Sequence, residues 1–178
     1  MNRARSILPA LILTCAIPIA SAQSPADLKY LHNLSAPISK LNPPDRHEIL
    51  HRLQIMASQL HAEAVITNGQ PSFFVQARPG LGSEHCGNIN CQLWIFDADH
   101  KILLEANAES IGYLPTVHNG RKDVLIARHN SATEQGVARW QFDGTRYRRV
   151  HCVDVTYADI DEKAYKQPHI KPTPCQYM

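Results

Sequence analysis

The sequence predicts an α+β domain: a mostly antiparallel, twisted sheet with one amphipathic helix packed on it, stapled by disulfides. Two observations carry the secondary structure. Apolar side chains recur at helical spacing through Asp45–Ala62, which is typical of a helix with one buried face. From Ser72 onward, short apolar runs alternate with turn residues, which is typical of antiparallel strands joined by hairpins.

The predicted helix has a clear start. Pro43-Pro44 suits the first turn of a helix, and Asn42 or Asp45 can cap it. The apolar side of this helix is formed by Ile49, Leu50, Leu53, Met56, Ala57 and Leu60. A short strand is expected after it, at Ala64–Thr67, before a turn at Gly69.

The remaining strands follow in close succession. They are expected at Ser72–Arg78, Gln92–Asp97, Lys101–Ala106, Asp123–His129, Val137–Phe142 and Arg146–Cys152. Successive residues of Leu93–Phe96 are all apolar although they point to opposite faces of a strand. Such a strand needs cover on both faces, and the Asp45–Ala62 helix is the expected cover for one.

The first residues have the pattern of a cleaved export signal. Arg3 and Arg5 form a basic start, an apolar run follows, and Ala20-Ser21-Ala22 is a small-residue cleavage site. The expected organisation is a signal peptide at 1–22, a lead-in segment at 23–44, a single domain at 45–157 and a C-terminal tail at 158–178. The expected location is the periplasm or the outside of the cell.

Net charge and hydropathy limit the classes of partner that the protein is expected to bind. The two arginines of the signal account for the whole formal net charge of +2, so the mature chain is balanced. A balanced chain lacks the basic footprint of nucleic-acid-binding proteins. No second apolar run is long enough to cross a bilayer. We therefore expect neither a nucleic acid partner nor a membrane span.

The cysteines predict disulfides. Removal of the signal, with Cys15, leaves Cys86, Cys91, Cys152 and Cys175. An even number of cysteines in an exported chain indicates two bridges. Three pairings satisfy this number, and the pairing of Cys86 with Cys91 and of Cys152 with Cys175 is the simplest. A four-cysteine zinc site fits poorly, because the spacings lack paired CxxC units.

The predicted helix contains an H-E-x-x-H motif, HEILH at residues 47–51. Over these five residues the chain resembles the zincin signature. That resemblance implies that His47 and His51 bind zinc while Glu48 acts as general base on the metal-bound water. The apolar stripe, however, centres near Leu53, so both histidines face away from the packed side. A solvated helix face without a cofactor is the favoured interpretation, and a small zinc-dependent hydrolase is the alternative.

The hairpin around Asp143-Gly144 carries a cluster of arginines. A two-residue type I′ turn there would place Arg139 opposite Arg148 and on the same face as Arg146. Opposed arginines destabilise a strand pair. They are explained by acidic neighbours on the next strand, or by a surface that receives an anionic partner. These three arginines are the candidate binding residues.

Three sequence patterns carry a wider resemblance. They are C-G-x3-C-x-L-W-I-F at 86–96, L-P-T-x-x-N-G-x-x-D-V at 114–124 and F-D-G-x-x-Y at 142–147. Together they resemble a group of small exported bacterial proteins with no assigned function. The matching residues are turn and core residues. The resemblance therefore indicates a shared fold and says almost nothing about activity.

The functional hypothesis follows from a compact stapled scaffold, a neutral charge and the lack of a convincing catalytic constellation. Together these features favour an exported, non-catalytic module that binds a protein or an envelope component. An inhibitor or immunity role is one version of this hypothesis.

Overall fold

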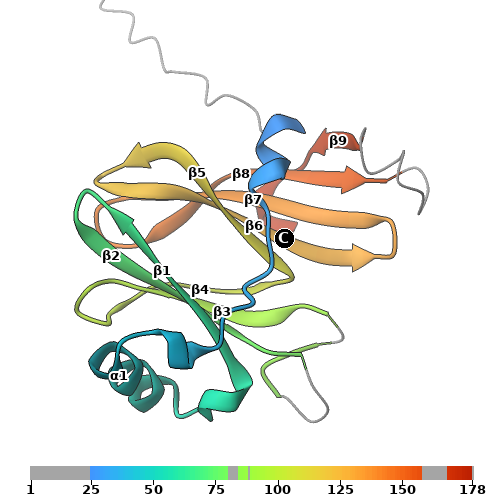
Figure 1. Ribbon diagram of the computed structural model, residues 1–178. Helices are drawn as coiled ribbons and strands as arrows, with labels where there is room; N and C mark the ends of the chain where they lie inside the picture. The colour runs from blue at the N-terminus through green and yellow to red at the C-terminus, as the bar shows by residue number, and fades with distance from the viewer. Residues whose placement is uncertain (1–24, 80–83, 88, 158–167, 178) are drawn as a thin grey trace, which may run out of the picture.

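Two antiparallel sheets pack against each other, and a helix lies beneath the first of them (Figure 1). This computed structural model describes residues 25–79, 84–87, 89–157 and 168–177. The first sheet contains, in order, β1 (Leu60–Thr67), β2 (Gln70–Ala77), β3 (Cys91–Phe96) and β4 (Ile102–Ala108). The second contains β5 (Ser110–His118), β6 (Arg121–Ser131), β7 (Glu134–Phe142), β8 (Tyr147–Thr156) and β9 (His169–Pro172). The predicted α+β class is confirmed, with the strands divided between two sheets.

Strand β3 is buried on both faces, as its sequence predicts. Leu93 and Ile95 join the core between the two sheets, which includes Ile111, Val124 and Ile126 from the second sheet. On the other face, Trp94 and Phe96 pack in a second core with Ile49 of the helix α1 (Pro43–Leu53). The helix therefore covers one face of β3, and the second sheet covers the other.

Helix α1 is shorter than the sequence predicts. It begins as expected, because the side chain of Asn42 accepts a hydrogen bond from the backbone N–H of Asp45 at 2.9 Å. It ends at Leu53, where Gln54 adopts a left-handed conformation with φ of 55°. The predicted end at Ala62 is wrong, because Leu60 and Ala62 lie at alternate, buried positions of β1.

The sequence also contains strands that its pattern does not predict. Strand β5 was missed because Gly112 and Pro115 interrupt it, and both residues are poor strand formers. Strand β9 lies in the C-terminal tail and pairs with Val153–Thr156 of β8. Within the described residues, no helix is long and apolar enough to cross a bilayer.

The lead-in segment ties the two sheets together. We call residues Pro25–Lys40 the strap. Its first part, the 3-10 helix η1 (Pro25–Tyr30), brings Leu28 and Tyr30 against the outer core of the second sheet. His32 then exchanges backbone hydrogen bonds of 2.8 and 2.9 Å with Ile111 of β5. Farther on, the carbonyl of Ala36 accepts from the N–H of Ala62 in β1 at 2.8 Å.

Gly112 allows the strap to dock. A Cβ at this position would lie 2.8 Å from the carbonyl oxygen of Tyr30 and 3.2 Å from the nitrogen of Leu31. Both atoms belong to the backbone, so no side-chain rotation relieves the clash. Strand β5 therefore needs a residue without a side chain where the strap crosses it.

We predict that Gly112→Ala lowers the free energy of unfolding by about 1–3 kcal/mol, because the strap backbone must shift. Urea unfolding of both proteins measures the loss. Gly87→Ala is a matched control, since its Cβ would meet only the carbonyl of Asn90 at 3.7 Å, an ordinary contact. Equal stabilities of the two variants would contradict the close approach.

Candidate functional site

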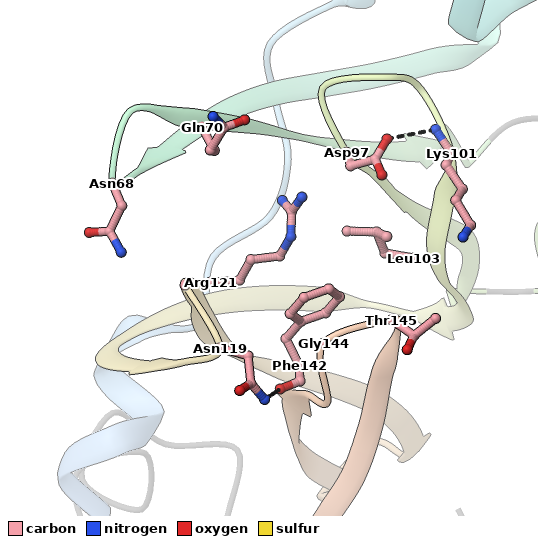
Figure 2. A pocket seen from close by; sticks show the side chains of 11 residues that line it. Asn68, Gln70, Asp97, Lys101, Leu103, Asn119, Arg121, Phe142, Gly144 and Thr145 are labelled. Carbon is pink, nitrogen blue, oxygen red and sulfur yellow. Dashed lines mark hydrogen bonds between the residues drawn. The ribbon is translucent and has the colours of Figure 1, made fainter.

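Four hairpin turns meet at one end of the molecule and enclose a cleft of about 440 Å³ (Figure 2). We call it the turn-end cleft. Residues from the β1–β2, β3–β4, β5–β6 and β7–β8 turns all line it, and both sheets therefore contribute. Loops held by a rigid scaffold are a common place for recognition. This cleft is thus the first candidate for a functional site.

The sequence determines the shape of these turns. Asn68-Gly69 and Asn119-Gly120 have positive φ at both positions, as type I′ hairpins require. Asn119 also donates its side-chain amide to the carbonyl of Phe142 at 2.8 Å, which ties two turns of the second sheet together. The rim of the cleft is therefore built from well-defined turns.

Carboxylates at the cleft serve the turns themselves. Asp97 Oδ1 accepts from the backbone N–H groups of Asp99 and Lys101 at 3.0 and 2.8 Å. Asp143 accepts in the same way from Thr145 and Arg146. Hydrogen bonds from Arg148 and these amides hold the pKa of Asp143 well below its usual range, so its carboxylate stays ionised.

Arg121 is the cation inside the cleft. Its side chain extends from β6 toward the centre of the cleft (Figure 2). The guanidinium donates to the hydroxyl of Ser72 at 2.6 Å and lies 5.1 Å from the ring centre of Phe142. Within the described part of the chain, it forms no ion pair with a carboxylate. A half-buried cation with neutral partners only is uncommon, because desolvation of a charge is costly unless the charge is paired.

The lining of the cleft suits binding. Its polar side chains are three amides, a hydroxyl, two cations and one carboxylate, from Asn68, Gln70, Asn119, Thr145, Lys101, Arg121 and Asp97. Tyr147 packs nearby against Phe142, and burial raises its pKa to about 12, so its phenol is neutral. Among the described lining residues there is no histidine beside a serine or cysteine, the pair that nucleophilic catalysis needs.

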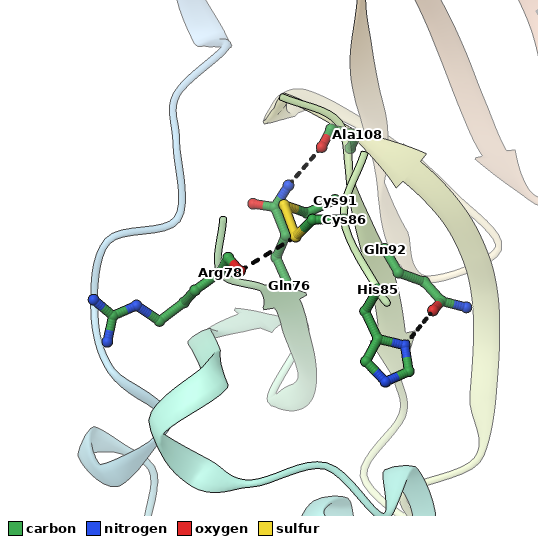
Figure 3. Close-up of a disulfide and its surroundings, with 7 residues drawn as sticks. All are labelled: Gln76, Arg78, His85, Cys86, Cys91, Gln92 and Ala108. Atoms are coloured by element: carbon green, nitrogen blue, oxygen red, sulfur yellow. Dashed lines mark hydrogen bonds between the residues drawn. A yellow bond between two sulfur atoms is a disulfide. The ribbon is translucent and has the colours of Figure 1, made fainter. Parts of the chain in front are cut away.

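The predicted disulfides are present. Cys86 is bonded to Cys91, and Cys152 to Cys175, which is the simplest of the three pairings. Figure 3 shows the first bridge beside Gln76, whose side-chain amide donates to the carbonyl of Ala108 at 2.8 Å. Cys91 is buried. The two bridges indicate an oxidising, extracytoplasmic setting.

The loop closed by the first bridge also clamps the sheets. The side chain of Asn90 donates to the carbonyl of His129 at 2.9 Å and accepts from its N–H at 2.8 Å. His129 belongs to β6 in the second sheet, whereas the Cys86–Cys91 loop leads into β3 of the first. The bridge between Cys86 and Cys91 therefore holds an inter-sheet contact in place, which is a structural role.

The HEILH residues lie on the solvent side of α1. His47, Glu48 and His51 are exposed, whereas Ile49 between them is fully buried. No group of three His, Cys, Asp or Glu side chains within the described ranges has the geometry to hold a metal ion. The structure thus brings His47 and His51 to one exposed face and places no third ligand beside them.

The predicted turn at Asp143-Gly144 is too short. Phe142 pairs with Tyr147, which leaves a four-residue connection instead of two. This longer turn, together with a register shift between Arg139 and Trp140, places Arg139 opposite His151, and the prediction that it faces Arg148 is wrong. The physical reason is the Asp143 carboxylate, which accepts from two backbone amides and stabilises the longer turn.

Arg139 has an internal partner. Its guanidinium contacts Asp123 of β6 at 2.5 and 3.0 Å, and this carboxylate is completely buried. His118 and Thr116 also bond Asp123, at 2.6 and 2.9 Å. The acidic neighbour on the next strand is therefore present for Arg139. Arg146 and Arg148 lie elsewhere, on the exposed end of the β7–β8 hairpin.

Sequence reasoning missed Arg121. The dipeptide Asn119-Gly120 is by itself typical of a hairpin turn, but the position of Arg121 in a cleft depends on how two separate sheets meet. The one available signal was a basic residue directly after a strong turn dipeptide, and such residues are usually solvated.

Comparison of the chain with protein-family models, with curated proteins and with solved structures finds no match. The argument on function therefore rests on the geometry of the chain itself.

We predict that Arg139→Met lowers the free energy of unfolding by about 3–5 kcal/mol, because it removes the guanidinium from a buried carboxylate. Arg148→Met is the matched control. Its ion pair with Asp143 is exposed, and such pairs contribute about 0–1 kcal/mol. Urea unfolding at neutral pH measures the free energy of unfolding of both variants. Equal decreases would show that the buried ion pair contributes no more to stability than the exposed one.

We also predict that His47→Ala, Glu48→Gln and His51→Ala combined change the free energy of unfolding by less than about 0.5 kcal/mol, because all three side chains are exposed. Ile49→Ala, on the buried face of the same helix, should cost about 2–5 kcal/mol. Thermal unfolding with and without equimolar zinc is the measurement. Stabilisation by zinc that the triple variant loses would instead reveal a metal site on this face.

Proposed function

We propose that the protein is a non-catalytic binding module of the periplasm or the extracellular space. In this proposal the turn-end cleft holds an anionic group of a protein or an envelope component. An inhibitor or immunity role is one version of the proposal, and membership of the group of small exported bacterial proteins that the sequence resembles is consistent with it.

The observation that carries the proposal is the half-buried guanidinium of Arg121. It contacts a hydroxyl and an aromatic ring, and no carboxylate of the described residues forms an ion pair with it. Its planar fork matches a carboxylate or a phosphate, which can accept two parallel hydrogen bonds. Lys101, also on the cleft, adds a second positive charge. A bound anion would supply the partner that this buried cation lacks.

The neighbouring carboxylates support this assignment. Asp97 uses Oδ1 for the amides of its own turn, and Asp143 is engaged by Arg148 and by the amides of the β7–β8 turn. Neither carboxylate neutralises Arg121. Amide side chains at the rim add donors and acceptors that can orient a ligand without reacting with it.

We predict that Arg121→Met abolishes capture of the partner. The mature wild-type protein and the variant are immobilised and exposed to solubilised envelope and periplasmic fractions. Each retained component is then quantified by mass spectrometry. At least one component should be enriched on the wild type and lost from Arg121→Met, because removal of the central charge of an interface costs about 2 kcal/mol or more.

Two control variants test whether any loss of capture is specific to the guanidinium of Arg121. Arg52→Met removes an exposed arginine at the C-terminal end of α1 that does not line the cleft, and should leave capture intact. Arg121→Lys keeps the charge but not the planar fork, and should retain part of it. Capture that is equal for the wild type and Arg121→Met, or absent for both, would refute the proposal.

A further inference from the structure

A second cleft, of about 430 Å³, opens between β4 and the β7–β8 hairpin. We call it the side cleft. It shares Leu103 with the turn-end cleft, so the two are neighbours. Its other walls include Ile102 and Leu104 of β4, Trp140 of β7 and three arginines, Arg146, Arg148 and Arg149.

The side cleft is strongly basic. Glu105 is the one carboxylate among the described residues that line it. Arg146 is exposed, and no described carboxylate forms an ion pair with it. Arg148 is paired with Asp143, but a pair so exposed is easily exchanged. Arg149 lies over the ring of Trp140 at 5.0 Å. The formal net charge of the whole chain is only +2, so this concentration of arginine is a local feature.

Two strand edges border the same cleft. Strand β4 is the last strand of the first sheet and pairs with β3 on one side. Strand β9 covers β8 over Val153–Thr156, so Tyr147–His151 has no described partner strand on that side. Unpaired strand edges present backbone N–H and C=O groups that can add another strand. Ile102, which lines the cleft and is 42% exposed, adds apolar surface.

We infer that the side cleft receives an extended, acidic segment of a partner protein. The segment adds as a strand to the free edge of β4, and its carboxylates contact Arg146, Arg148 and Arg149. This inference rests on the proposed function, since the same partner would also place an anionic group beside Arg121. It goes further by specifying a polypeptide of defined charge and conformation.

Charge complementarity selects this occupant. Arginines on the edge of β8 discourage pairing with a neutral strand, and the same charges attract an acidic one. The indole Nε1 of Trp140 is buried and has no described hydrogen-bond acceptor. Because Trp140 lines the cleft and Trp94 lies in the core between α1 and the first sheet, Trp140 can report occupancy by fluorescence.

The test uses three synthetic ten-residue peptides. The first alternates glutamate with valine, the second alternates lysine with valine, and the third repeats the first with N-methyl groups at alternate residues. Titrations follow tryptophan emission at low salt. The glutamate peptide should bind, the lysine peptide should not, and N-methylation should weaken binding at least about tenfold, because it removes backbone donors.

Variants of the protein locate the site. Arg146→Glu should weaken binding of the glutamate peptide by about tenfold or more, whereas Arg52→Glu on α1 should leave it unchanged. Hydrogen exchange should slow at the amides of Ile102–Ala108 when the peptide is bound, since a strand added at this edge forms hydrogen bonds with β4.

Several outcomes would overturn the inference. They are absence of binding, equal binding of the lysine or N-methylated peptide, unchanged exchange in β4, and an Arg146→Glu variant that binds normally. Vesicles of anionic phospholipid that bind as tightly as the peptide, through Arg146, would show that the ligand is a membrane surface. If capture of the natural partner depends on Arg121 but not on Arg146, the inference fails while the proposed function stands.

Discussion

Burial of both faces of β3 is the constraint on which the rest of the structure depends. Leu93 and Ile95 require one apolar partner surface, and Trp94 and Phe96 require another. Helix α1 is a sufficient cover for one face, but a single short helix cannot cover two. The chain therefore builds a second sheet, and the two sheets together bring four hairpin turns to one end. The turn-end cleft is thus a consequence of how the core is covered.

Charges in this fold are divided between internal and external roles. Asp123 is buried with Arg139, and the carboxylates of Asp97 and Asp143 stabilise turns. Arg121 and Arg146, in contrast, form no ion pair within the described residues. A chain with a formal net charge of only +2 therefore presents a locally positive surface, because part of its negative charge is used for folding. The net charge of a chain affects non-specific binding to highly charged partners such as nucleic acid. Specific recognition depends instead on the local excess of positive charge at a site.

Much of the fold, and little of the candidate site, was predictable from the sequence. Local patterns identified β3, the Asn119-Gly120 turn and the Asn42 cap, because each depends on neighbours in the chain. The end of α1 was misplaced because Leu60 and Ala62 fit a helical period as well as a strand. The length of the turn at Asp143 was predicted wrongly, because the Asp143 carboxylate accepts hydrogen bonds from two backbone amides and so stabilises a four-residue turn. Arg121 and Arg146 gain their surroundings from the meeting of two sheets, which no local pattern encodes.

The strap has a consequence for the order in which the molecule forms. Its residues lie near the start of the chain, yet they form hydrogen bonds with Ala62 of the first sheet and Ile111 of the second. Closure of such a long loop is entropically costly until its ends are already near each other, so we expect the two sheets to assemble before the strap docks. Since the strap pairs through isolated backbone bonds at two strand edges, it also forms a natural unit of local opening. A segment near the start of the chain is thus expected to dock late and to release early.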